Sequence, residues 1–179
     1  MASLKKEQLD AATAFVGVAI AVLKDEHGVH AETAVAGVAR MAGTFLFRSF
    51  DFPLDGIAPG QAVLSDKANV AGPPLVQLLG GVIEKLEVPV DPSKVDAGTK
   101  DAPKPSLSFL ETQKKLEPEF TRIKERQGLT YPEAAEAAVV ATGMLIQKTS
   151  EVLDPTAAFG LAVYGFIEGS KTAPAPVAE

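Results

Sequence analysis

The residues that could bind a metal ion lie together in one short segment. Asp25-Glu26-His27-Gly-Val-His30-Ala-Glu32 contains two imidazoles and three carboxylates, and both groups bind zinc and similar ions. The segment spans a predicted turn, however, so these side chains do not share one face of a helix. His27 and His30 are nevertheless candidate metal ligands, because of their side-chain chemistry. The alternative is a charged helix end, where histidine is favourable by itself.

Arg40 is a second candidate, because it lies inside an otherwise apolar segment. Its guanidinium could bind an anionic ligand or point to water. It could also pair with an acidic residue of the loop that follows, Asp51, Asp55 or Asp66. Since arginine is rarely buried without a partner, a paired or solvated structural role is favoured over a ligand contact.

The segment Ser65-Asp66-Lys67-Ala-Asn69 places a serine two residues before a lysine, a pair found in some hydrolases. No histidine lies near it, and the chain has no Gly-x-Ser-x-Gly sequence. A helix start capped by Ser65 or Asp66 is favoured instead. No phosphate loop, dinucleotide fingerprint, zinc ribbon or calcium loop is present either. The sequence therefore indicates no cofactor and favours a protein that is not an enzyme.

Composition narrows the class of protein. The chain has 179 residues, of which 46% are hydrophobic and 22% charged, with no Trp and no Cys. The abundance of alanine favours helices. The formal net charge of −6 argues against nucleic-acid binding, which needs a basic face. The lack of cysteine excludes disulfides and thiolate sites and fits a cytoplasmic protein.

An apolar run at residues 11–23 follows two lysines and raises the question of membrane insertion. As a membrane span it is too short, because about 18 apolar residues are needed. As a signal peptide it lacks a small-residue cleavage site, and Glu7 and Asp10 lie where a basic region is expected. We expect no membrane segment and a buried helix here.

Residues 28–49 are echoed by residues 128–149, one hundred positions later. Glycines match at the start and in the middle of both segments, as Gly28 with Gly128 and Gly43 with Gly143. A third match follows at a shorter offset, between 81–84 and 165–168. Matched elements in the same order predict an internal duplication.

Six helices are expected from apolar residues at helical spacing and from capping residues. They begin near Ser3, Ala31, Pro73, Ser108, Thr130 and Asp154. The first should end at His27 before Gly28, and the second near Phe50. Pro118 should kink or restart the fourth helix.

In the second helix, Ala39 and Gly43 are four residues apart, so a neighbouring helix could approach closely over them. Small residues at this spacing permit close helix contacts. Thr33, Arg40 and Thr44 are expected on the opposite face of that helix.

The sequence therefore predicts an all-α protein, a six-helix bundle built from two three-helix repeats with approximate two-fold pseudo-symmetry and packed as one domain. Its parts are residues 1–87 as the first repeat, including a long loop at 51–72, a linker at 88–106, the second repeat at 107–170, and a disordered tail at 171–179. The helices that carry Gly43 and Gly143 should lie centrally and near each other.

Three functions are compatible with these features. The first is a non-enzymatic interaction or structural module that forms a homo-oligomer, with a dimer favoured and the apolar loop 51–72 in the interface. The second is binding of a small apolar or anionic ligand in a cleft between the repeats. The third, with least support, is a metal-dependent enzyme using His27 and His30. The residues proposed to contact a ligand are Arg40, Phe45, Asp66 and Asn69, with Phe15, Phe47 or Phe166 lining the same cavity.

Overall fold

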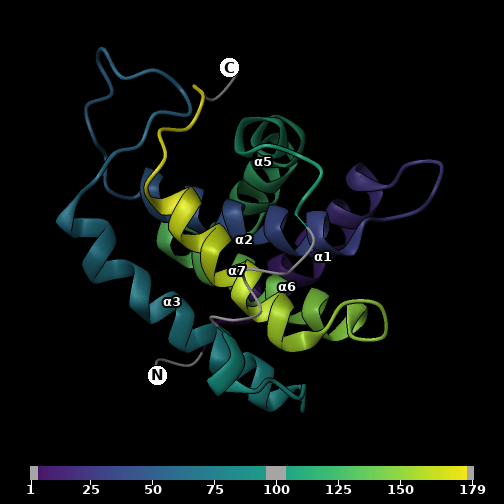
Figure 1. The fold of residues 1–179 in the computed structure, drawn as a ribbon. Helices are drawn as coiled ribbons and strands as arrows, with labels where there is room; N and C mark the ends of the chain where they lie inside the picture. The colour runs from purple at the N-terminus through teal and green to yellow at the C-terminus, as the bar shows by residue number, and fades with distance from the viewer. Residues whose placement is uncertain (1–3, 96–103, 177–179) are drawn as a thin grey trace.

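A computed structural model of the chain describes residues 4–95 and 104–176. These residues form six α-helices, one short 3-10 helix and no strand (Figure 1). The predicted all-α helical bundle is confirmed. The helices are α1 (Lys6–Leu23), α2 (Ala31–Arg48), α3 (Asp66–Lys85), α5 (Phe109–Arg126), α6 (Tyr131–Thr149) and α7 (Pro155–Ser170), and the 3-10 helix is η1 (Pro92–Lys94).

Helix α2 lies at the centre of the bundle and is buried along almost its whole length. Helices α1, α5, α6 and α7 pack around it. Thr33, Arg40 and Thr44 are therefore buried like the apolar residues of α2. Their predicted placement on an outer face is wrong, because neighbouring helices cover α2 on every side.

The backbones of α2 and α7 almost touch. A Cβ atom added at Gly169 would lie 2.2 Å from the carbonyl oxygen of Arg40. One added at Gly43 would lie 2.5 Å from the carbonyl oxygen of Phe166, and one at Gly165 would lie 2.8 Å from Cβ of Ala39. Contacts this short leave no room for any side chain, so the close approach predicted over Ala39 and Gly43 is confirmed.

Helix α6 is the second central helix. It packs against α2, and its residues from Ala137 to Gly143 are all buried. Gly143 faces α3 rather than α2, since a Cβ there would lie 2.4 Å from Cγ1 of Val82. The prediction that the helices carrying Gly43 and Gly143 lie centrally and side by side is confirmed.

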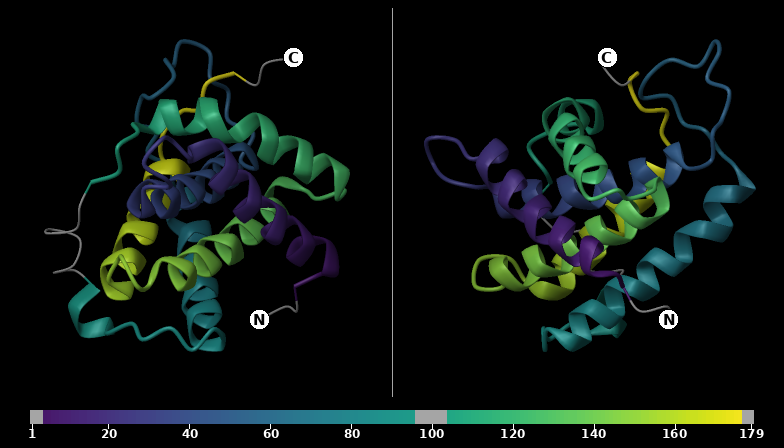
Figure 2. Two further views of the ribbon diagram at one scale, coloured as in Figure 1. Left: turned by 90° about the vertical axis from the view of Figure 1, so that its right-hand side faces the viewer. Right: turned by 180° about the vertical axis from the view of Figure 1, so that it is seen from behind.

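Helix α3 lies along the outside of the bundle in both views of Figure 2. It starts at Asp66, and the side chain of Ser65 accepts a hydrogen bond from the amide of Ala68 at 3.2 Å. The predicted start at Pro73 is wrong, because the cap at Ser65 starts the helix two turns earlier. Pro73 and Pro74 are both exposed, so water can bind the carbonyl groups that they leave unpaired inside the helix.

The other helix ends mostly follow the capping residues. Ser108, Thr130 and Asp154 cap α5, α6 and α7 through their side chains, as predicted. Helix α1 ends at Leu23 instead of His27, because Asp25 and Gly28 pair with each other in a tight turn. The predicted start at Ser3 lies outside the described residues.

Helix α5 continues through Pro118 as one helix, so the restart that was one of the two predicted outcomes does not occur. The carbonyl that loses its partner belongs to Lys114, four residues earlier. Both residues are exposed, so water can satisfy that carbonyl and the helix survives.

The loop between α2 and α3 packs on its own chain. Gly60 donates to the carbonyl of Ala173 at 2.8 Å, and Val63 donates to the carbonyl of Lys171 at 2.7 Å. Phe52 contacts the Phe47 ring at a centroid distance of 5.4 Å. Residues 171–176 are therefore held in place, which differs from the disorder predicted for 171–179. Residues 177–179 lie outside the described part of the chain.

The close approach of α2 and α7 predicts the effect of one methyl group. We expect Gly169→Ala to lower the free energy of unfolding by about 3 kcal/mol, because the added methyl overpacks the helix contact. Gly17→Ala is the matched control, since Gly17 lies in α1 with open space around its Cβ position. There alanine should raise the stability by up to about 1 kcal/mol through helix propensity.

Urea denaturation of both variants measures the two effects. Equal stabilities for the two alanine variants would contradict the packing described for α2 and α7.

Candidate functional site

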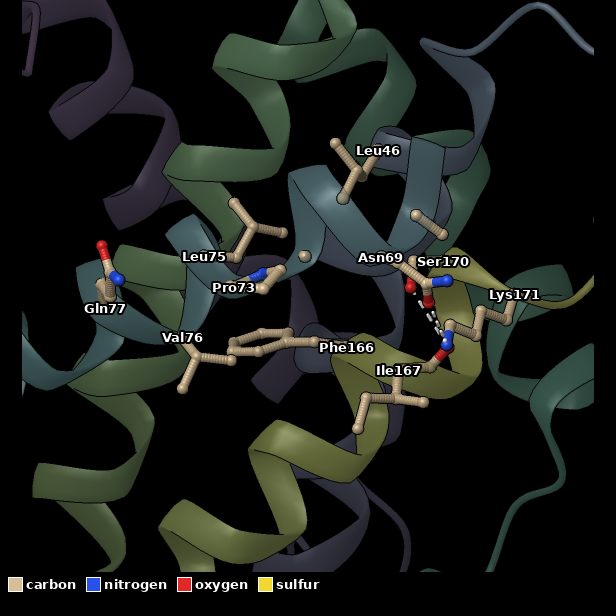
Figure 3. Close-up of a pocket in the computed structure, with 12 residues that line it drawn as sticks. Leu46, Asn69, Pro73, Leu75, Val76, Gln77, Phe166, Ile167, Ser170 and Lys171 are labelled. Atoms are coloured by element: carbon tan, nitrogen blue, oxygen red, sulfur yellow. Dashed lines mark hydrogen bonds between the residues drawn. The ribbon is translucent and has the colours of Figure 1, made fainter. Parts of the chain in front are cut away.

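A groove of about 450 Å³ lies between α3 and α7. Its floor is formed by Leu46, Leu75 and Phe166, which are buried, and the ring of Phe166 lies beside Val76 in Figure 3. The floor is therefore apolar and supplied by three different helices. The residues that line the groove are Leu46, Ala68, Asn69, Gly72, Pro73, Leu75, Val76, Gln77, Phe166, Ile167, Ser170 and Lys171.

The polar groups of the groove are concentrated at one end. There Lys171 donates from Nζ to Oδ1 of Asn69 at 2.8 Å, as the dashed line in Figure 3 shows. Ser170 lies next to this pair, and its hydroxyl donates to the carbonyl of Ile167 within α7. Gln77 lies at the other end of the groove in the same view. The site thus has apolar walls and a polar end that carries a positive charge.

The packing of the bundle fixes the two walls. Gly165 and Gly169 allow α7 to pack closely against α2, which sets the position of Phe166 and Ser170, the residues that directly follow them. In α3, Leu75, Leu79 and Ile83 recur every four residues and are buried. This spacing places them on one face of the helix, and the groove is lined by Leu75 from this face and by residues of the adjacent face of α3.

The structure separates the residues predicted to contact a ligand. Asn69 lines the groove, and Asp66 is exposed at the first position of α3 outside it. Phe45 and Arg40 are buried inside the bundle and do not line it. Of the phenylalanines named with them, Phe166 lines the groove.

Arg40 is part of a buried polar network. Its Nε donates to Glu168 at 2.6 Å, and its Nη1 donates to the carbonyl of Leu107 at 2.8 Å and to Oγ1 of Thr112 at 3.1 Å. The partner is thus a carboxylate of α7 and not an aspartate of the loop. This network ties α2 to α7 and to the start of α5.

A second network of this kind surrounds Arg48, which sequence reasoning missed. Its Nε donates to Glu117 at 2.5 Å and its Nη2 to the carbonyl of Ala175 at 2.8 Å. Gln113 donates to the other oxygen of Glu117 and accepts from the amide of Ala175. The sequence spacing could have indicated this second network. Arg48 follows Arg40 by eight residues and therefore lies near the same face of α2.

The two histidines lie apart from the groove. His27 is exposed, with Nε2 at 3.4 Å from Glu26. His30 contacts Oγ1 of Thr33 at 2.8 Å through Nδ1 and Glu32 at 3.3 Å through Nε2. Among residues 4–95 and 104–176, no three His, Asp or Glu side chains are grouped so that they could hold a metal ion.

Three carboxyl groups outside the groove have lowered pKa values. Hydrogen bonds from Ser108 lower the pKa of Glu111, and the pKa is lowered furthest in two others. Hydrogen bonds from Lys5 and then from Thr130 lower the pKa of Glu133 to about 2. Hydrogen bonds from Ser93 and Lys94 lower the pKa of Asp91 to about 2. Both carboxylates accept bonds at the start of a helix, which favours the charged form. The shifts are explained by helix capping and do not indicate a catalytic group.

No protein-family model, curated protein or solved structure matches this chain. In the part of the chain that the structure describes, no helix has both the length and the apolar character needed to cross a bilayer. The geometry of the groove is therefore the main guide to function.

The buried network around Arg48 predicts a large stability effect. We expect Glu117→Gln to lower the free energy of unfolding by about 3 kcal/mol, because it leaves the partly buried guanidinium of Arg48 without its carboxylate. Glu119→Gln on the same helix is the control, since Glu119 pairs with Arg122 at the exposed surface. The control should change stability by less than about 1 kcal/mol.

Thermal unfolding followed by circular dichroism distinguishes the two variants. If Glu117→Gln melts at the same temperature as the control, the ion pair with Arg48 is not important for stability.

Proposed function

We propose that this protein acts by binding, without catalysis, a small ligand with an apolar body in the groove between α3 and α7. The observation that carries the proposal is the groove itself, with its volume of about 450 Å³ and its buried apolar floor. Small-molecule sites typically enclose about 300–1,000 Å³ and combine apolar walls with a few polar groups. The groove has this composition, with Asn69 and Lys171 as its polar end.

The length of the groove supports a short chain-like ligand. Asn69 and Gln77 mark its two ends on α3 and are eight residues apart, which corresponds to about 12 Å at 1.5 Å per residue. An alkyl chain along this line would contact Val76 and Ile167 on the two walls and Phe166 on the floor. Removing these apolar groups from water would supply the main binding energy.

We also propose that the bundle arose from two three-helix repeats, α1–α3 and α5–α7. Two matched features support this. Gly28 and Gly128 both have positive φ, at 110° and 64°. Gly43 of α2 packs on α7, while the corresponding Gly143 of α6 packs on α3. In this arrangement the groove lies between the third helices of the two repeats, where a cleft was predicted.

Filling the groove tests the proposed function. Gly72 lines the groove, and its Cβ position has no atom within 4 Å, so Gly72→Leu should be accommodated and should occupy the ligand space. Gly80→Leu is the matched control, because Gly80 is in the same helix with the same open surroundings but outside the groove. Gly80→Leu should keep or raise the helix stability, whereas in Gly72→Leu this gain is offset because the new side chain directly precedes Pro73.

The measurement is a titration with decanol followed by amide chemical shifts. We expect shifts at Ile167, Ser170 and Lys171 in the unmodified protein and in Gly80→Leu. In Gly72→Leu these shifts should be at least tenfold weaker at equal decanol concentration. Equal shifts in all three proteins would show that the groove is not the binding site.

A homodimer is the second candidate function, and exposed apolar side chains favour it. Leu64 and Val70 are 83% and 76% exposed, and both belong to the segment 51–72 predicted as an interface. The half-buried Phe52, Leu54, Ile57 and Val63 of that segment pack on the protein itself. Exposed apolar side chains can mark an interface, so we propose that a second copy covers Leu64 and Val70.

Charge placed at this surface tests the dimer. Val70→Asp should reduce the fraction of dimer at least tenfold without lowering the melting temperature, because Val70 has few contacts to lose. Val152→Asp is the control, since Val152 is 79% exposed in the turn between α6 and α7. Multi-angle light scattering gives the mass of each variant. A dimer that Val70→Asp leaves intact would contradict this interface, and so would a monomer at every concentration.

A further inference from the structure

We infer that the ligand of the α3–α7 groove is a monocarboxylate with an apolar tail, whose carboxylate binds Lys171 and Asn69. This inference rests on the proposed function and adds the chemical class of the ligand. It follows from the charge and hydrogen-bonding state of the two side chains at the polar end of the groove.

The ammonium of Lys171 is a cation without an anionic partner among the described residues. It donates to the neutral amide of Asn69 at 2.8 Å, and no carboxylate of residues 4–95 and 104–176 forms an ion pair with it. The acid three residues earlier in α7, Glu168, is bound to Arg40 instead. Lys171 is also partly buried, so water screens its charge less than that of a fully exposed lysine.

The amide of Asn69 strengthens the preference for an anion. Because an ammonium group can only donate, the amide oxygen must face Lys171, and the amide nitrogen keeps its two donors for other partners. The polar end of the groove therefore presents donors from both residues. A carboxylate has only acceptor oxygens, and hydrogen bonds to a charged acceptor are about twice as strong as neutral ones.

One carboxylate opposes this preference. Asp66 lies three residues before Asn69 in α3, but it is exposed and does not line the groove. Its side chain lies outside the apolar walls, where water screens it. A single uncompensated cation inside the groove matches a ligand with one negative charge.

Three probes with the same tail isolate the head group: decanoate, decanol and decylamine. By isothermal titration calorimetry, we expect the affinity for decanoate to exceed that for decanol about tenfold. Decylamine should bind more weakly than decanol, because its ammonium faces the Lys171 charge. If decanol or decylamine binds as tightly as decanoate, the inference is overturned.

Two substitutions assign the effect to the polar end. Lys171→Met keeps an unbranched apolar side chain of nearly the same length and removes the charge. The affinity for decanoate should therefore fall to that for decanol, and the affinity for decanol should not change. Asn69→Asp supplies an internal partner for Lys171 and should also remove the preference for decanoate. Lys85→Met is the control, since it removes the same charge at the other end of α3 and should leave all affinities unchanged.

The outcomes separate this inference from the proposed function. Binding of decanol and decanoate with equal affinity, lost for both in Gly72→Leu, would support the groove and overturn the carboxylate. Failure of all three probes to bind the unmodified protein would overturn the proposed function and the inference with it. A preference for decanoate that survives in Lys171→Met would place the anion contact elsewhere.

Discussion

The near contact between the backbones of α2 and α7 determines how the rest of the bundle is arranged. Because Gly43, Gly165 and Gly169 carry no side chains at this crossing, α7 lies directly on α2. The two helices then leave space for α5 and α6 on other sides of α2. A helix surrounded in this way must be buried all round, which explains why the polar residues of α2 are inside the protein.

Burying α2 also buries Arg40 and partly buries Arg48, and a carboxylate offsets the free-energy cost of removing each charge from water. Arg40 binds Glu168 of α7, and Arg48 binds Glu117 of α5. Each guanidinium also donates to one backbone carbonyl, that of Leu107 for Arg40 and that of Ala175 for Arg48. The two networks thus hold the segments before α5 and after α7 against the bundle, so that the polar groups have a structural role.

The sequence was sufficient for the features that depend on local chemistry. The caps at Ser108, Thr130 and Asp154 and the small residues Ala39 and Gly43 gave the helices and one close contact correctly. Features that depend on distant partners could not be predicted. The carboxylates that bind Arg40 and Arg48 are 128 and 69 residues away along the chain. Of the residues predicted to contact a ligand, Asn69 lines the groove. It could be singled out from the sequence because it belongs to a polar segment at a helix start, which is a local feature. Lys171 was assigned to a tail, and only packing shows that it faces Asn69.

The groove exists because α3 lies against the bundle by one face only. Leu79 and Ile83 in its second half are buried, while its first two turns are connected to the rest of the helix across Pro73 and Pro74. These prolines lack amide hydrogens, so the carbonyls of Asn69 and Val70, four residues earlier, lose their partners within the helix. The first turns are held instead by the cap at Ser65, the buried Ala68 and the hydrogen bond from Lys171. The hydrogen bond between Lys171 and Asn69 thus connects the end of α7 to the first turn of α3 at the polar end of the groove.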